Sequence, residues 1–172
     1  ANKVSQKNKK QSEILGSNES IKSFQDQIKN LDDQKLTLST KISELKTKID
    51  SSMSLRDKKK DQIETLKMQV DALSTRLEKE KSLLSQLQTN NADPAEIKKQ
   101  QLKVKSVSST LKSKKESVIS LKNEITQLNS NIAESKQTID KLKQSMVSLP
   151  GKISNLKSKI SALASKVESA KK

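Results

Sequence analysis

Cysteine and histidine are both missing from this chain of 172 residues. Without cysteine the chain can form no disulfide, thiolate metal site or cysteine nucleophile. Without histidine it lacks the commonest general base and metal ligand. The sequence also contains no glycine-rich phosphate loop, HExxH motif or EF-hand loop. We therefore expect a non-enzymatic protein with no cofactor, no metal site and no small-molecule substrate.

Bulky and helix-breaking residues are also scarce. The chain has one phenylalanine, no tryptophan or tyrosine, and only two glycines and two prolines, and its apolar fraction is 30%. It therefore lacks the aromatic side chains that dominate the buried area of thick cores, but it can bury a narrow stripe along a helix. No apolar run approaches the roughly 18 residues of a membrane span, so we expect no membrane insertion.

Charge is abundant and mostly positive. The net charge of +15 divides unevenly, with +4 over residues 1–93 and +11 over residues 94–172. A strongly basic half suits an acidic partner. The alternative is that these lysines have no partner and only form a solvated helix face.

A seven-residue repeat organises the first half of the chain, from Ile14 to Leu87. Apolar residues recur at two positions of each heptad, a and d, with a starting at Ile14 and d at Ser17. Alternating spacings of three and four place these residues on one face of a helix, which we call the seam. Its predicted members in this half are Ile21, Phe24, Ile28, Leu31, Leu38, Ile42, Leu45, Ile49, Ile63, Leu66 and Leu73.

The repeat resumes at Ile97 in a different phase. Had the first phase continued, the next a position would fall at residue 98, and a shift of one residue turns the seam by about 100°. The predicted seam members in the second half are Leu121, Ile125, Leu128, Ile132, Ile139, Leu142, Leu149, Ile153, Leu156, Ile160 and Leu163.

Helix-ending and helix-starting residues separate the two halves. Asn90 and Asn91 tolerate the left-handed conformation in which helices often end. Asp93 is a good N-cap and Pro94 a good first helical residue, while Glu96 can close a capping box. We therefore predict an all-α fold, a long antiparallel coiled-coil hairpin with two arms of about 75 residues.

Other features set the expected boundaries. Residues 1–13 are basic and aperiodic, and Gly16 interrupts the pattern that follows. Pro150-Gly151 predicts a kink or short break, beyond which the heptad phase continues; a full reversal into a third antiparallel helix is the alternative. The expected segments are a frayed or disordered arm (1–13), helix 1 (14–89), a turn (90–93), helix 2 (94–149) and a C-terminal helix on the same seam (150–172).

Some seam positions carry polar side chains. Such residues usually fix register or oligomeric state, and a hinge or partner-docking point at 52–60 is the alternative. They are Lys35, Ser52, Arg56, Lys59, Glu80, Lys114 and Ser135.

Lysines are also frequent at the e position beside the seam. In an antiparallel pair the e positions of the two helices face each other, so these lysines would line one positive edge that an acidic polymer could bind. Because the a-Ile, d-Leu bias also suits intermolecular pairing, hairpins could join into bundles or filaments. The second-half lysines of this edge are Lys115, Lys122, Lys136, Lys143 and Lys157.

These patterns favour a structural role. We expect a coiled-coil rod, spacer or filament subunit that forms a homo-oligomer through helix–helix contacts. The alternative is a sequence-independent binder of nucleic acid or another acidic polymer through residues 94–172. The chain starts at Ala1 rather than methionine, which fits a secreted or surface protein as well as a trimmed segment, and the compartment stays open.

Overall fold

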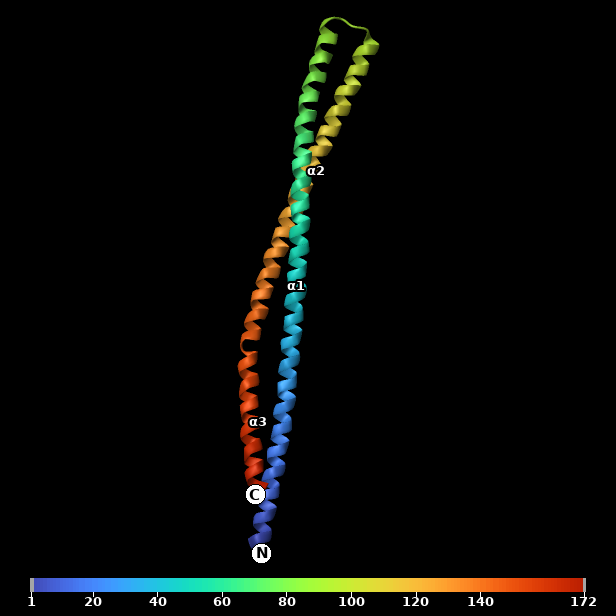
Figure 1. The fold of residues 1–172 in the computed structure, drawn as a ribbon. Coiled ribbons are helices and arrows are strands. Elements are labelled where there is room, and N and C mark those ends of the chain that lie inside the picture. The colour runs from blue at the N-terminus through green and yellow to red at the C-terminus, as the bar shows by residue number, and fades with distance from the viewer. Residues whose placement is uncertain (1, 172) are drawn as a thin grey trace. The chain divides into compact units, whose positions relative to one another are not determined.

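The structure is a computed structural model that describes residues 2–171, and those residues are helical almost throughout (Figure 1). The helices are α1 (Asn2–Thr89), α2 (Pro94–Val147) and α3 (Leu149–Lys171). The chain reverses between α1 and α2, so the predicted all-α helical hairpin is confirmed. Ala1 and Lys172, the end residues of two predicted segments, lie outside the described residues.

The helix at the N-terminus is longer than predicted. Residues 1–13 were expected to fray, but α1 begins at Asn2 and continues through Gly16 without interruption. Lysine and glutamine are good helix formers, and a single glycine costs only about 1 kcal/mol in a helix. Because residues 2–13 are exposed, this first part of α1 follows from helix propagation rather than from packing.

The reversal between α1 and α2 has a Schellman-type helix end. Asn91 adopts a left-handed backbone, with φ of 52°. The N–H of Ala92 donates to the carbonyl of Leu87 at 3.0 Å, and the N–H of Asn91 donates to the carbonyl of Gln88 at 3.3 Å. These are the two bonds of a Schellman motif, which satisfies the last carbonyls of a helix.

The next helix starts immediately. Asp93 precedes Pro94, the first residue of α2, and accepts a hydrogen bond on its Oδ1 from the N–H of Ala95 at 3.3 Å. Its carbonyl accepts the N–H of Ile97 at 3.1 Å, the first bond of the helix. Asp93 is therefore the N-cap of α2. Glu96 lies exposed in the first turn, and its capping-box bond stays a prediction.

The second interruption falls two residues earlier than predicted. Helix 2 was expected to end at Leu149, before Pro150-Gly151, but α2 ends at Val147 and Leu149 already belongs to α3. The carbonyl of Ser148 accepts the N–H of Lys152 at 3.2 Å. Proline is tolerated in the first turn of a helix, where N–H groups have no helical acceptor. The helix therefore breaks before Pro150 and restarts through it.

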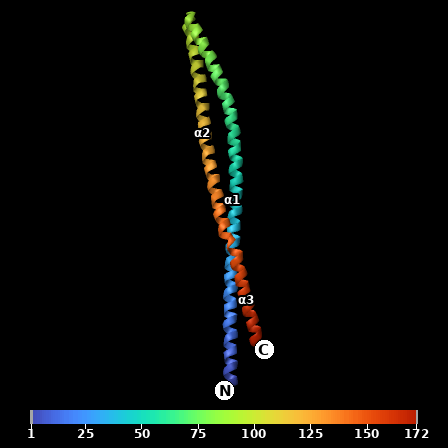
Figure 2. The same cartoon turned by 90° about the vertical axis from the view of Figure 1, so that its left-hand side faces the viewer.

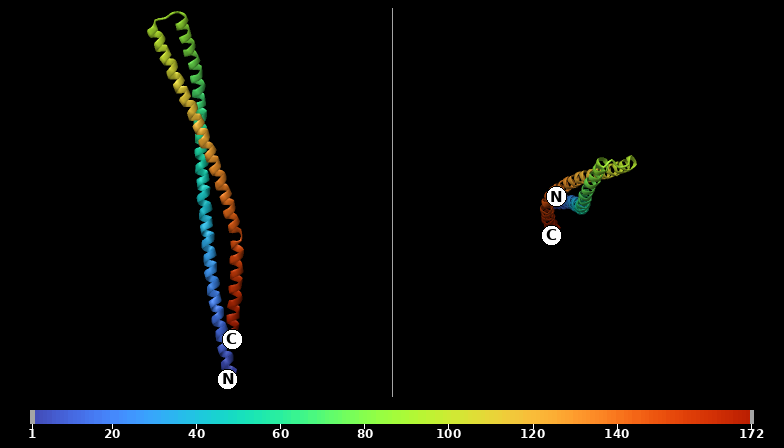
Figure 3. Two further views of the ribbon diagram at one scale, coloured as in Figure 1. Left: turned by 180° about the vertical axis from the view of Figure 1, so that it is seen from behind. Right: turned by 90° about the horizontal axis from the view of Figure 1, so that it is seen from above.

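Two compact units make up the chain. The hairpin unit comprises residues 49–134 and the terminal unit the residues on either side of it. In the hairpin unit, the end of α1 and the start of α2 lie side by side and antiparallel (Figure 2). In the terminal unit, the beginning of α1 lies beside the end of α2 and α3 (Figure 3). There the Lys159 ammonium lies 5.6 Å from the centre of the Phe24 ring.

Candidate functional site: the helix–helix interface

Burial along the helices recurs at alternating intervals of three and four residues. Every a and d position from Ile14 to Leu87 and from Ile97 to Ala170 is buried or half-buried except Lys35, which is exposed. All the apolar seam residues predicted from the sequence are therefore buried or half-buried. The most buried side chains include Ile42, Ile63, Val107, Leu111, Ile132, Ile139, Leu149 and Ile153.

The interface is thin, however. Leu149 and Gln100 are the least exposed of the described residues that are buried, each at 4%, and no described side chain is enclosed completely. Two helices can cover each other along one face only, so both edges of the seam stay in contact with water. This leaves room for further apolar burial if another helix packs alongside.

Three polar residues occupy consecutive seam positions in the hairpin unit. Ser52, Arg56 and Lys59 are half-buried. The Lys59 ammonium forms an ion pair with the Glu124 carboxylate at 2.6 Å, and Arg56 Nη1 donates to Asn129 Oδ1 at 3.3 Å.

These polar contacts cross from α1 to α2 without interrupting either helix. The Lys59 side chain is 20% exposed and that of Glu124 is 49% exposed. Solvent therefore screens the pair, and its contribution to stability is at most about 1 kcal/mol. The contacts help to specify which residues of α1 face which residues of α2, because a shift in register would break them.

A second polar contact lies nearer the turn. Gln100 is buried, and its side-chain amide donates to the backbone carbonyl of Glu80 at 2.9 Å and to the Glu80 carboxylate. Among the described residues, no buried side-chain nitrogen or oxygen is left without a hydrogen-bond partner. Gln100 is thus compatible with burial because its side-chain amide makes hydrogen bonds.

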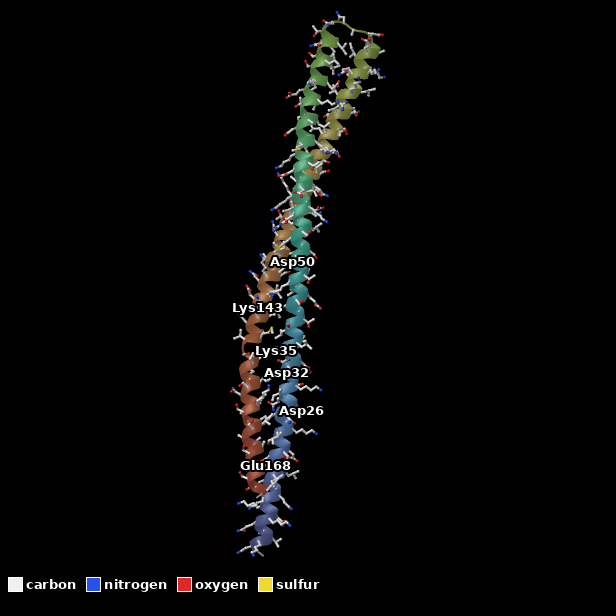
Figure 4. The ribbon with its side chains drawn as sticks, viewed as in Figure 1. Asp26, Asp32, Lys35, Asp50, Lys143 and Glu168 are labelled. Carbon is white, nitrogen blue, oxygen red and sulfur yellow. The ribbon has the colours of Figure 1, made fainter. Side chains whose placement is uncertain are left out.

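The predicted lysine edge divides between the two units. Lys115 and Lys122 belong to the hairpin unit, whereas Lys136, Lys143 and Lys157 belong to the terminal unit. All five side chains are exposed. Figure 4 labels Lys143 on α2 together with Lys35 on α1, which is the one seam residue turned to solvent.

The sequence reasoning missed an acidic stripe on α1 within the hairpin unit. Five acidic residues follow consecutive a positions of α1 by one residue, and all are exposed. Only the spacing of seven could have revealed them, because each carboxylate taken alone looks like an ordinary solvated charge. The acidic stripe consists of Asp50, Asp57, Glu64, Asp71 and Glu78.

Both kinds of charge border one open groove of the hairpin unit. Its lining comprises Lys67, Val70, Asp71, Lys115, Val118 and Ile119. The groove is mostly apolar, and Ile119 is 60% exposed. This places the residues beside the seam on α1 and α2 along the same side of the hairpin unit.

Metal-ligating clusters and membrane-spanning helices are not found in residues 2–171. No group of three or more acidic residues in this part of the chain could hold a metal ion. None of the helices described is long and apolar enough to cross a membrane.

Comparison with known proteins adds no relative from which a role could be transferred. No protein-family model, curated protein or solved structure matches the chain significantly.

Proposed function

We propose that the chain is a non-enzymatic structural protein whose hairpin is an antiparallel coiled coil. It acts as a rod, spacer or assembly subunit through helix–helix contacts and forms a homo-oligomer or filament. The observation that carries this proposal is the coincidence of the buried positions with the a and d columns of both repeats. Burial with this period is what coiled-coil packing requires.

The exposed surface supports the same proposal. The groove beside the seam leaves Ile119 exposed, and the seam itself is only one helix pair thick. A single fully buried Leu or Ile side chain contributes about 1.5–3 kcal/mol. Packing of further helices along an edge would complete the burial of side chains such as Val70 and Val118, which are half-buried in the hairpin unit.

Circular dichroism and sedimentation velocity test this proposal together. We expect strong helical ellipticity, a frictional ratio typical of an elongated particle, and a mass that rises with protein concentration. Replacing Ile63 and Ile132, two buried seam residues, by aspartate should abolish both helicity and association. A compact globular particle or weak helicity in the wild-type protein would rule the proposal out.

A second candidate function is the binding of acidic polymers by the lysine-rich second half. It is favoured by the net charge of +11 over residues 94–172 and by the exposure of all five lysines of the predicted edge. Lysine contacts with phosphates would give an affinity that falls steeply with salt. Unchanged mobility of DNA or of an acidic polysaccharide at low salt would exclude it.

A further inference from the structure

A groove in the terminal unit brings together lysines from two helices. It lies where the first turns of α1 are beside the last turn of α3 (Figure 1). Four of its lining residues are lysines, and all four side chains are exposed. We call these residues the basic cluster: Lys3, Lys7 and Lys10 on α1, and Lys171 on α3.

No acidic side chain among the described residues lines this groove. The nearest acidic residues along the chain are Glu13 on α1 and Glu168 on α3, and neither is part of the lining. Within residues 2–171, the four lysines have no ion-pair partner. The basic cluster is therefore a concentration of positive charge that no direct contact in this part of the chain neutralises.

The lysines of the hairpin unit have different surroundings. There Asp71 lines the mostly apolar groove together with Lys67 and Lys115. The half-buried Lys59 forms its ion pair with Glu124. In both places a carboxylate lies near the lysines, whereas the groove of the basic cluster is lined by lysines without one.

The three α1 lysines of the basic cluster lie on the seam face of the helix. Counting heptads back from the a position at Ile14 places Lys10 at d, Lys7 at a and Lys3 at d. Spacings of three and four residues put all three on one side of α1. At 1.5 Å per residue they extend over about 10 Å of helix. At this end of α1 the seam therefore changes from an apolar stripe into a row of positive charges.

We propose that the basic cluster binds the phosphate backbone of a nucleic acid without regard to base sequence. Lysine ammonium groups bind phosphates as point charges. A nucleic-acid strand carries one phosphate per about 3.4 Å of helix axis, so about three phosphates match the length of the three α1 lysines. Gln6 and Gln11 line the same groove and can donate further hydrogen bonds. This site goes beyond both proposed functions, because three of its four lysines lie outside residues 94–172.

Other acidic partners fit the basic cluster less well. A helical protein would pack against apolar side chains at a and d, but lysines occupy these positions here. A membrane surface requires a helix with a broad apolar face, and Val4 is the only apolar residue between residues 2 and 13. A polymer held by its charges alone therefore fits best. The lining described contains no aromatic side chain to stack on a base, so the binding is independent of sequence.

Binding should also stabilise the first turns of α1. Lys3 and Lys7 lie one turn apart, as do Lys7 and Lys10, and like charges at this spacing destabilise a helix. Phosphates bound between the ammonium groups would remove this repulsion. Because residues 2–13 are exposed, packing gives their backbone amides little protection. We therefore expect the nucleic acid to slow amide hydrogen exchange in these residues.

Fluorescence anisotropy of a labelled oligothymidine of about 20 nucleotides, titrated with the full chain, tests the proposal. Four lysine–phosphate contacts predict a slope of about −2.8 for the logarithm of the association constant against the logarithm of salt concentration. Lys7→Gln with Lys10→Gln removes two contacts, so the slope should fall to about −1.4 and the affinity at about 50 mM salt by about 60-fold. No binding by the wild type at about 20 mM salt would overturn the proposal.

A matched control removes the same charge elsewhere on α1. Lys22→Gln with Lys29→Gln replaces two exposed lysines of the terminal unit that each have acidic residues one turn away along the helix. This variant should keep the wild-type affinity within about twofold. Both variants should keep the wild-type helical ellipticity, because glutamine is nearly as good a helix former as lysine. Equal losses of affinity in both would show that net charge governs binding, which would contradict the proposal.

Amide hydrogen exchange locates the contact. Bound oligothymidine should slow exchange in residues 2–13 and leave residues 49–134 unchanged. Protection confined to residues 49–134 would assign binding to the second candidate function and overturn this inference. The same conclusion would follow if Lys115→Gln with Lys122→Gln weakened binding and Lys7→Gln with Lys10→Gln did not.

Further probes separate the nucleic acid from other acidic partners. Tighter binding of poly-glutamate or of phosphatidylserine vesicles than of oligothymidine would assign the basic cluster to an acidic protein or a membrane surface, and would overturn the inference. A helical, associating wild type that does not bind oligothymidine would also overturn it, but would leave the structural role standing. A weakly helical or compact wild type that binds oligothymidine through the basic cluster would overturn the structural role and support this inference.

Discussion

The contribution of the seam to the free energy of unfolding can be measured by replacing two leucines of one helix with alanine. One of these leucines is buried and the other is exposed. Leu111 is 7% exposed and Leu102 is 59% exposed, and both lie on α2 within the hairpin unit. Because the two residues have the same chemistry and the same helix propensity, Leu→Ala at each site differs chiefly in the packing that it removes. Comparing the two variants therefore separates the effect of side-chain burial from the effect of the residue type.

The expected magnitudes follow from the exposures. Leu111→Ala removes nearly a whole buried side chain, and Leu→Ala substitutions in cores cost about 2–5 kcal/mol. The two-helix interface is open at both edges, so water can fill the space and the cost should lie near the lower limit, about 2–3 kcal/mol. Leu102→Ala removes a side chain that is already mostly hydrated, and it should change the free energy of unfolding by less than about 0.5 kcal/mol.

Urea unfolding followed by circular dichroism at 222 nm provides the assay. It should be run at a protein concentration below the onset of association, so that unfolding of the single chain is measured. Equal losses of stability for Leu111→Ala and Leu102→Ala would refute the assignment of Leu111 to the interface. A change in the slope of the free energy of unfolding against urea concentration would indicate that the substitution also altered the compactness of the folded or unfolded state.

Further predictions concern the helix ends and interruptions. Gly16→Ala should raise the free energy of unfolding by up to about 1 kcal/mol, because Gly16 is helical and a β-carbon there meets nothing within 4 Å beyond the adjacent residues and the local helix backbone. A loss of stability in urea unfolding would show that the glycine is needed. Asp93→Ala removes the N-cap of α2 and should cost about 1 kcal/mol, measured as a lower thermal midpoint, whereas an unchanged midpoint would mean that the cap contributes nothing. Pro150→Ala restores an N–H group next to the break at Ser148 and should increase helical ellipticity and thermal stability; lower ellipticity would contradict this account of the break.

The sequence was sufficient to predict the hairpin because its two main signals are local. The change of heptad phase between Leu87 and Ile97 indicates that one helix cannot continue with its apolar face intact. The residues between them end one helix and start another through side chains and backbone conformations that depend on immediate neighbours only. Such signals need no knowledge of the rest of the fold.

Other features could not be predicted because they depend on balances between weak effects. Residues 2–13 are exposed and carry no apolar repeat that would mark them as helical, so only their helix propensity favours the extension of α1 to Asn2. The break falls at Ser148 rather than at Pro150 because a helix can include proline in its first turn. That Asp71 lines one groove with Lys67 and Lys115 depends on how α1 and α2 pair, which the local sequence around each residue does not specify.

A distance between α1 and α2 within the hairpin unit tests the central claim most directly. Because the chain lacks cysteine, nitroxide labels can be placed at two engineered cysteines, Asp61→Cys and Asn123→Cys, both at exposed positions, and measured by double electron–electron resonance. Antiparallel helices packed along the seam predict a single distance of about 20–30 Å, given interaxial distances of 8–10 Å plus the reach of the labels. A helix continuing straight through the turn would separate the labels by about 90 Å, and a distribution beyond about 60 Å would contradict the account.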